Sequence, residues 1–200
     1  MSELLKNNYS FSTHPHKILL ILVIGGLSVL FLSFTAAYGY SIFKSQIAAL
    51  EVPVIFFFNT LVLIGSSFAI SMAKRAFNQD NVKRLKNNLL TTIGLTTLFL
   101  IGQILGWRDI SLREISLTHS VAASYVYIIS GLHMVHIVAG IPFLVSFYIY
   151  TAKLKNSVKV LLYFADSNKK LRLHLLATYW HFLDLVWLYL ITFFAGYYFL

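Results

Sequence analysis

The sequence predicts an all-α integral membrane protein, a bundle of five transmembrane helices. Hydrophobic residues make up 58% of the chain and charged residues only 12%, whereas a typical soluble domain has about 25% charged residues. Five apolar segments are each long enough to cross a hydrocarbon core, which takes roughly 20 helical residues. These segments are continuously apolar and do not alternate with polar residues, a pattern that favours helices over a β-barrel.

We expect the five helices over residues 17–43, 52–77, 85–107, 121–150 and 171–199. The N-terminal stretch is polar, and no small-residue cleavage site follows the first apolar run, so we expect that helix to be retained and not removed as a signal peptide. Pro53 opens the second helix, where its missing N–H costs nothing. Trp107 and Tyr150 end the third and fourth at the depth of the aromatic belt, and the terminal GYYFL does the same for the fifth. The connections are short, so we expect residues 1–200 to form a single transmembrane domain.

Positive charge is concentrated on one side of the predicted bundle. The formal net charge is +9, and most Lys and Arg residues lie in the N-terminal tail, in the loop between the second and third helices, and in the loop between the fourth and fifth. The positive-inside rule therefore predicts a cytoplasmic N-terminus and a C-terminus outside. This asymmetry accounts for the charge without nucleic-acid binding. The chain has no cysteine, which excludes disulfides and thiolate metal sites.

Asp184 is the one acidic residue predicted to lie in mid-span. A charged side chain at the bilayer centre costs about 2.5–3.5 kcal/mol on insertion scales, so it usually faces protein and has a partner. His133 and His136 lie one turn apart in the preceding helix, and antiparallel packing would bring them to the depth of His181 and Asp184. The spacing therefore predicts a polar cluster that clamps the last two helices together.

Three roles fit this cluster. It can be structural, with hydrogen bonds that hold helices together; it can ligate haem, as in membrane b-type cytochromes; or it can relay protons. The structural role is favoured, because two His residues on one helix cannot ligate one iron from opposite faces and because the other helices offer no chain of acids. The residues assigned to the clamp are Gly131, His133, His136, Gly140, Trp180, His181 and Asp184.

Two further features have two interpretations each. Gly131 and Gly140 would let another helix approach closely, although glycines are common in membrane helices anyway. Lys74 and Arg75, at the inner end of the second helix, are placed to meet lipid phosphates, but they are also ordinary positive-inside charges.

Several motifs resemble one known family. YWHFLDLVWL (residues 179–188) resembles the signature of the last helix of subunit III of the haem-copper oxidases, the family of cytochrome c oxidase. SGLHMVHIVAG (130–140) resembles the preceding helix of that family, and the segments 52–73 and 97–107 resemble its two earlier helices through Pro53, Asn59 and Gln103. Five helices correspond to the short form of the family, which is common in bacteria and lacks the first two helices of the longer version.

The resemblance implies an accessory subunit without a catalytic centre or metal of its own. Haem and copper would reside in subunits I and II; this chain would pack on subunit I, bind phospholipid and help to sustain proton uptake in a bacterial inner membrane. Membership of a larger respiratory supercomplex, or of a purely structural scaffold, is compatible with the same motifs. Three positions depart from the family, since Ser28, Gly106 and His174 stand where it commonly has Glu, so a proton-relay role for those acids does not carry over.

Two alternatives remain open at this stage. The electron donor could be cytochrome c or a quinol, because the donor is recognised in subunits I and II. A stand-alone b-type cytochrome would instead use His133, His136 and His181 directly.

Overall fold

The computed structural model describes residues 15–45, 52–112, 121–154 and 157–199. These residues form helices and no strand, in the order α1 (Pro15–Ser45), α2 (Val54–Asn78), α3 (Val82–Leu112), α4 (Val121–Ala152), α5 (Ser157–Ala165) and α6 (Ser167–Phe199). Five of them, all but α5, are long and apolar enough to cross a membrane. The predicted membrane bundle of five spans is therefore confirmed. The short α5 was not predicted, because the segment between the last two spans was interpreted as a loop.

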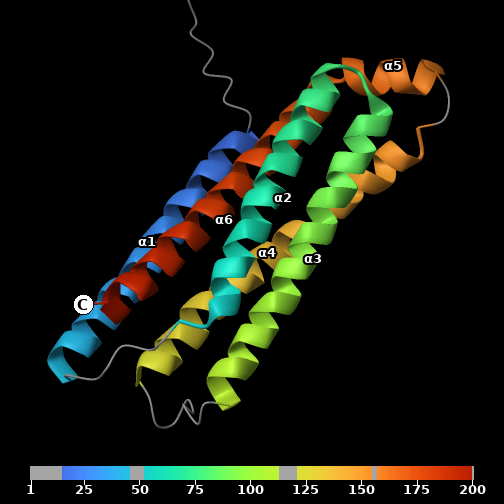
Figure 1. Ribbon diagram of the computed structural model, residues 1–200. Coiled ribbons are helices and arrows are strands. Elements are labelled where there is room, and N and C mark those ends of the chain that lie inside the picture. The colour runs from blue at the N-terminus through green and yellow to red at the C-terminus, as the bar shows by residue number, and fades with distance from the viewer. Residues whose placement is uncertain (1–14, 46–51, 113–120, 155–156, 200) are drawn as a thin grey trace, which may run out of the picture.

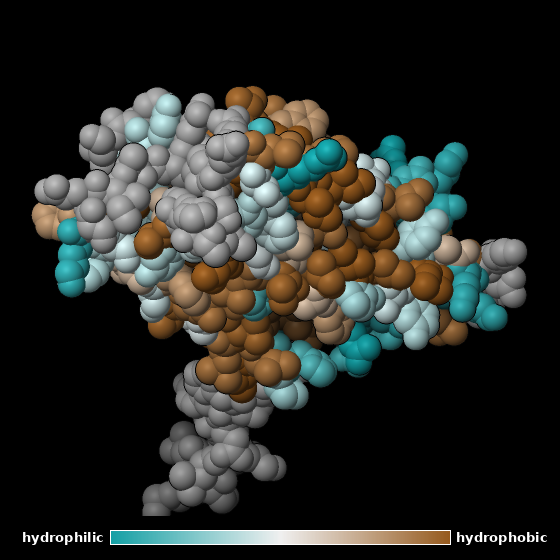
Figure 2. Space-filling view, turned by 90° about the horizontal axis from the view of Figure 1, so that it is seen from below, coloured by the Kyte–Doolittle hydropathy of each residue, from teal (hydrophilic) through white to brown (hydrophobic). Residues whose placement is uncertain are grey.

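The spans form an elongated bundle, in which α1 and α6 run side by side and α2 and α3 form a second pair (Figure 1). Half of the apolar window of α6 is buried, against 17% of that of α1. The last helix is therefore the central element, packed on α1, α2 and α4. Hydrophobic side chains spread across the face shown in Figure 2, and hydrophilic ones gather mainly toward its margins. This distribution suits a surface that contacts lipid.

The turn between α2 and α3 shows why these two helices pair closely. Asp80 adopts a left-handed backbone conformation with φ of 53°, a region in which Asp and Asn are enriched among non-glycine residues. The Asn81 side chain then accepts a hydrogen bond from the Arg84 backbone N–H at 2.9 Å and so caps the first turn of α3. The tight reversal leaves α2 and α3 antiparallel and in contact along their lengths.

Two apolar clusters make up the core. One contains Phe31, Phe56, Phe99 and Trp187, which come from α1, α2, α3 and α6. The other, which contains Phe77, Leu85, Leu144, Tyr163 and Trp180, joins α5 to the spans. Each cluster is built mainly from aromatic and branched aliphatic side chains, so the helices pack through shape and van der Waals contact, as is usual in lipid.

Candidate functional site

A row of polar contacts joins α6 to α2. His181 is held by two serine hydroxyls of α2, with Nδ1 at 2.7 Å from Ser67 Oγ and Nε2 at 3.1 Å from Ser71 Oγ. Both ring nitrogens are thus satisfied, since a hydroxyl can either donate or accept. Serines four residues apart lie on one face of a helix, which is why one imidazole can reach both.

Two tryptophans extend this row in both directions along α6. The Trp180 indole N–H donates to Ser66 Oγ at 3.2 Å, and the Trp187 indole N–H donates to Thr60 Oγ1 at 3.1 Å. We use the name α2–α6 seam for the polar and tryptophan side chains that meet between these two helices. They are Thr60, Ser66, Ser67 and Ser71 of α2 and Trp180, His181, Asp184 and Trp187 of α6. Residues 180, 184 and 187 share one face of α6 because helical side chains recur at this spacing.

Asp184 also belongs to the seam. Its side chain is buried, with 7% of its surface exposed, and it lies beside the hydroxyl of Ser67. One carboxylate oxygen, Oδ2, has no hydrogen-bond partner among the described residues. The predicted partners of His181 and Asp184 were the histidines of the preceding span, but the structure places both residues against α2. Residue spacing therefore did not predict which neighbouring helix these two side chains face.

The two histidines of α4 have different surroundings. His133 is fully buried, and its ring packs at 5.4 Å from the Trp187 ring and 5.9 Å from the Phe99 ring, between centroids. Neither of its ring nitrogens has a hydrogen-bond partner in the part of the chain that is described. His136 is half-buried and bonds through Nδ1 to the Leu132 carbonyl of its own helix at 2.7 Å. The cluster expected from the sequence is therefore divided between two helix contacts.

The contact between α4 and α6 depends on a glycine. A β-carbon at Gly140 would lie 2.9 Å from the Trp180 ring and 3.1 Å from the Tyr179 ring, so a larger residue has no room there. The Tyr179 hydroxyl donates to the His136 carbonyl at 2.9 Å and closes the same contact. At Gly131 a β-carbon would make an ordinary 3.6 Å contact with Trp107. The close approach predicted for both glycines thus occurs at Gly140.

The positions that depart from the family pattern have local partners. The Ser28 hydroxyl donates to the Ile24 carbonyl of its own helix at 2.8 Å. Gly106 lies under the Phe56 ring, which would overlap a β-carbon there. His174 Nδ1 lies 3.4 Å from Lys74 Nζ.

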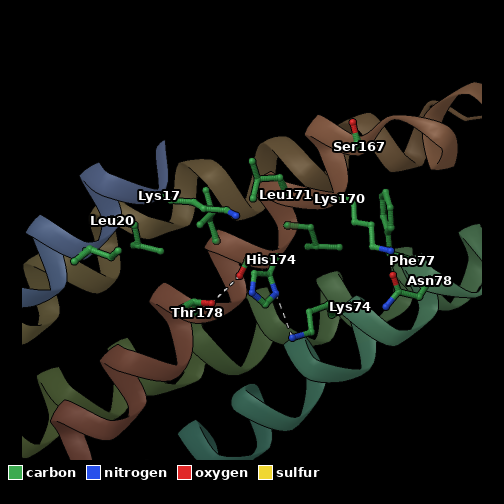
Figure 3. A pocket seen from close by; sticks show the side chains of 13 residues that line it. Lys17, Leu20, Lys74, Phe77, Asn78, Ser167, Lys170, Leu171, His174 and Thr178 are labelled. Atoms are coloured by element: carbon green, nitrogen blue, oxygen red, sulfur yellow. Dashed lines mark hydrogen bonds between the residues drawn. The ribbon is translucent and has the colours of Figure 1, made fainter. Parts of the chain in front are cut away.

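That last pair lines a pocket of about 590 Å³ between the ends of α1, α2 and α6 (Figure 3). The side chains that bring basic nitrogen atoms to it are Lys17, Lys74, Lys170 and His174, and among the described residues its lining includes no carboxylate. The apolar part of its lining consists of Leu20, Ile21, Phe77, Leu171, Leu173 and Leu175. Arg75 is exposed and does not line the pocket, so of the two lipid-binding candidates the structure brings Lys74 alone to it. Sequence reasoning missed Lys17, Lys170 and His174, although their shared position at the basic end of the bundle was a signal.

No group of three or more His, Cys, Asp or Glu side chains that could hold a metal ion occurs among the described residues. His133 packs among aromatic rings, His136 bonds to its own helix and His181 bonds to α2. His133 and His136 both approach the Phe31 ring of α1, with centroids 6.2 Å apart in each pair, whereas His181 bonds to the serines of α2.

Comparison with known proteins bears on the same residues. Residues 17–199, which include all of these positions, match the family model of cytochrome c oxidase subunit III. The chain belongs to the cytochrome c oxidase subunit III family. The resemblance in the sequence motifs is thereby confirmed.

Individual relatives agree with the family match. The chain is 34% identical over 137 residues to a probable cytochrome c oxidase subunit 3 of Rickettsia prowazekii. The aligned region covers 68% of this chain and 46% of that protein. It is 30% identical over 146 residues to cytochrome c oxidase subunit 3 of Ornithorhynchus anatinus. In that case the aligned region covers 73% of this chain and 50% of that protein. The chain thus spans about half the length of the curated relatives it matches.

Proposed function

We propose that this protein is an accessory, non-redox subunit III of a proton-pumping terminal oxidase of the cytochrome c oxidase type, packed on subunit I. The family match over residues 17–199 carries the proposal. The geometry of the α2–α6 seam supports it, because the intramembrane His and Asp residues are used in helix contacts. The chain's contribution to respiration is then to hold a stable membrane bundle and its lipid beside the subunits that carry haem and copper.

The proposed location is the bacterial inner membrane, with the N-terminus in the cytoplasm. Basic residues from four different helices lie at one end of the bundle, where α1 begins, α2 ends, α3 begins and α6 begins: Lys17, Lys74, Arg75, Lys83, Arg84, Lys86, Lys169, Lys170 and Arg172. At the other end the described basic residues are Lys44 and Arg108. The positive-inside rule assigns the richer end to the cytoplasm.

We further propose that the pocket between α1, α2 and α6 holds a phospholipid. Lysine side chains attract phosphate near the cytoplasmic surface of a membrane, each by about 1 kcal/mol. The leucines and phenylalanine of the same pocket offer an apolar wall to acyl chains. A ligand with an anionic head and an apolar body matches both halves of this lining.

The competing role, a b-type cytochrome that uses His133, His136 and His181, is disfavoured by side-chain geometry. Haem ligation by two histidines needs rings that face each other across a gap as wide as a porphyrin. Here the His181 ring nitrogens are both engaged by α2, and the His133 ring is enclosed by Phe99 and Trp187. Large rearrangements of two helix contacts would be required to present both rings to one iron.

The experiment that tests the proposal is purification of a tagged copy from native membranes in mild detergent. The co-purifying proteins are identified and oxygen consumption is measured with reduced cytochrome c and, separately, with a quinol. The proposal predicts larger haem-containing partners and oxygen consumption sustained by cytochrome c. Activity with quinol alone would instead assign the chain to a quinol oxidase, and recovery without partners would contradict the subunit role.

A further inference from the structure

The short helix α5 lies across one end of the bundle, between the last two spans (Figure 1). One side of it is fixed to the core. Tyr163 and Phe164 pack against Phe77, with ring centroids at 5.8 and 5.0 Å, and the Tyr163 hydroxyl lies 3.3 Å from Thr151 Oγ1. The helix is therefore held in place by its own packing.

The other side of α5 is apolar as well. Leu161 and Leu162 have 72% and 65% of their surface exposed, although they stand in the same nine-residue helix as the buried Tyr163. A surface helix in water normally carries polar residues on its outer face. Neighbouring exposed leucines on such a helix indicate a surface that is covered in the cell.

The surroundings of α5 indicate what covers it. Because α4 ends at Ala152 and α6 begins at Ser167, α5 lies at the level where the neighbouring spans leave the hydrocarbon. Lys159 is exposed on α5 itself, and Lys153, Lys170 and Arg172 are exposed close to it in the chain. Asp166 adds little opposing charge, because Lys169 Nζ lies 3.5 Å from its carboxylate. Apolar side chains flanked by lysines are the pattern of a helix that rests in a membrane interface.

We propose that α5 is an interfacial helix, which inserts Leu161 and Leu162 into the boundary between headgroups and acyl chains of an anionic leaflet, with Lys159 at the phosphates. Lysines near an anionic surface gain electrostatic free energy, and burial of two leucines adds apolar contact. The helix would anchor the basic end of the bundle at a fixed depth, in addition to the five spans. This role does not depend on which complex contains the chain.

Because the chain has no cysteine, single spin labels can be attached at Leu161→Cys and Leu162→Cys. The full chain, with the partners that co-purify, is reconstituted in vesicles of phosphatidylglycerol and phosphatidylethanolamine. Collision rates of each label are measured with oxygen, which concentrates in lipid, and with a water-soluble nickel chelate. Asn168→Cys, on an exposed polar position of α6, is the matched control, and a preparation with the native residues gives the background from partner cysteines.

The proposal predicts an oxygen-to-nickel collision ratio several-fold higher at 161 and 162 than at 168. A ratio equal to that at 168 would show α5 facing water and would overturn it. Low collision rates with both reagents would show a protein surface covering the leucines and would overturn it too. Replacement of phosphatidylglycerol by phosphatidylcholine should lower the oxygen-to-nickel ratio at 161. This decrease should be smaller when the label at 161 is combined with Lys159→Gln. A ratio that stays unchanged with and without Lys159→Gln would contradict the proposed attraction of Lys159 to anionic lipid.

Discussion

His181 and Ser67 are joined across the α2–α6 seam by a 2.7 Å hydrogen bond between Nδ1 and Oγ. The last span is thereby tied to α2 by the same histidine that the sequence suggested as a partner for α4. This bond, with its counterpart to Ser71, accounts for an imidazole inside an apolar helix without a metal.

The same substitution at two histidines should have different consequences for stability. His181→Phe removes two hydrogen bonds of the seam, and bonds of this kind between membrane helices contribute about 0.6 kcal/mol each on average. We expect a lower midpoint of thermal unfolding for the purified complex. His133→Phe keeps a ring in contact with Phe99 and Trp187 and removes two buried nitrogens that have no hydrogen-bond partner among the described residues. The midpoint should therefore be nearly unchanged. If the two variants lose stability equally, the seam does not have the role given to it.

Gly140→Ala should destabilise the contact between α4 and α6. Its β-carbon would lie 2.9 Å from the Trp180 ring, and overpacking of this kind typically costs about 1–3 kcal/mol. Gly131→Ala is the matched control, because its β-carbon meets Trp107 at an ordinary 3.6 Å. Retention of the chain on its partners during detergent titration would distinguish the two. Equal retention of both variants would refute the close-approach role of Gly140.

Asp184→Leu should weaken retention of this chain while the haem content of the preparation per co-purified partner stays the same. The leucine removes the polar group that lies beside Ser67 at the centre of the seam. Asp184→Asn keeps an oxygen in that place and should retain more of the chain. Loss of haem from partners that are still bound would point to a role beyond helix packing.

Lys74→Gln combined with Lys170→Gln should reduce the amount of anionic phospholipid that co-purifies, measured by mass spectrometry. Both side chains line the pocket of Figure 3, and loss of two positive charges weakens attraction for phosphate. Arg75→Gln changes a charge next to Lys74 but outside the pocket, and it should leave the lipid unaltered. An equal effect of both variants would assign the lipid to general surface charge.

Hydropathy and length were sufficient to predict the five spans, because the bilayer itself dictates how many apolar residues a helix must have. They could not predict α5, since nine residues with one lysine between two basic segments also fit a loop. The interfacial position that we propose for it depends on exposed leucines, and their exposure can be recognised only when the structure shows that Tyr163 is the side packed on the core.

The partners of the polar residues illustrate a second limit. The position of a residue along a span predicts its depth in the bilayer, and a prediction of that kind was possible for His133, His181 and Asp184. Rotation about the helix axis decides which neighbour each residue faces, and it is set by packing of bulky groups such as Trp180 against Gly140. For the same reason two residues that are neighbours in the sequence can face different surroundings: Lys74 lines the pocket and Arg75 does not.

We infer that His181 ties α6 to α2 and that none of His133, His136 and His181 binds haem. The most direct measurement is the reduced-minus-oxidised spectrum of the tagged chain before and after its partners are removed by stronger detergent, for the native protein and for His181→Phe. We predict that the haem signal leaves with the partners and that, before their removal, the signal per partner is the same in both proteins. Haem that stays with the native chain alone and is lost from the variant would contradict the claim and make His181 a ligand.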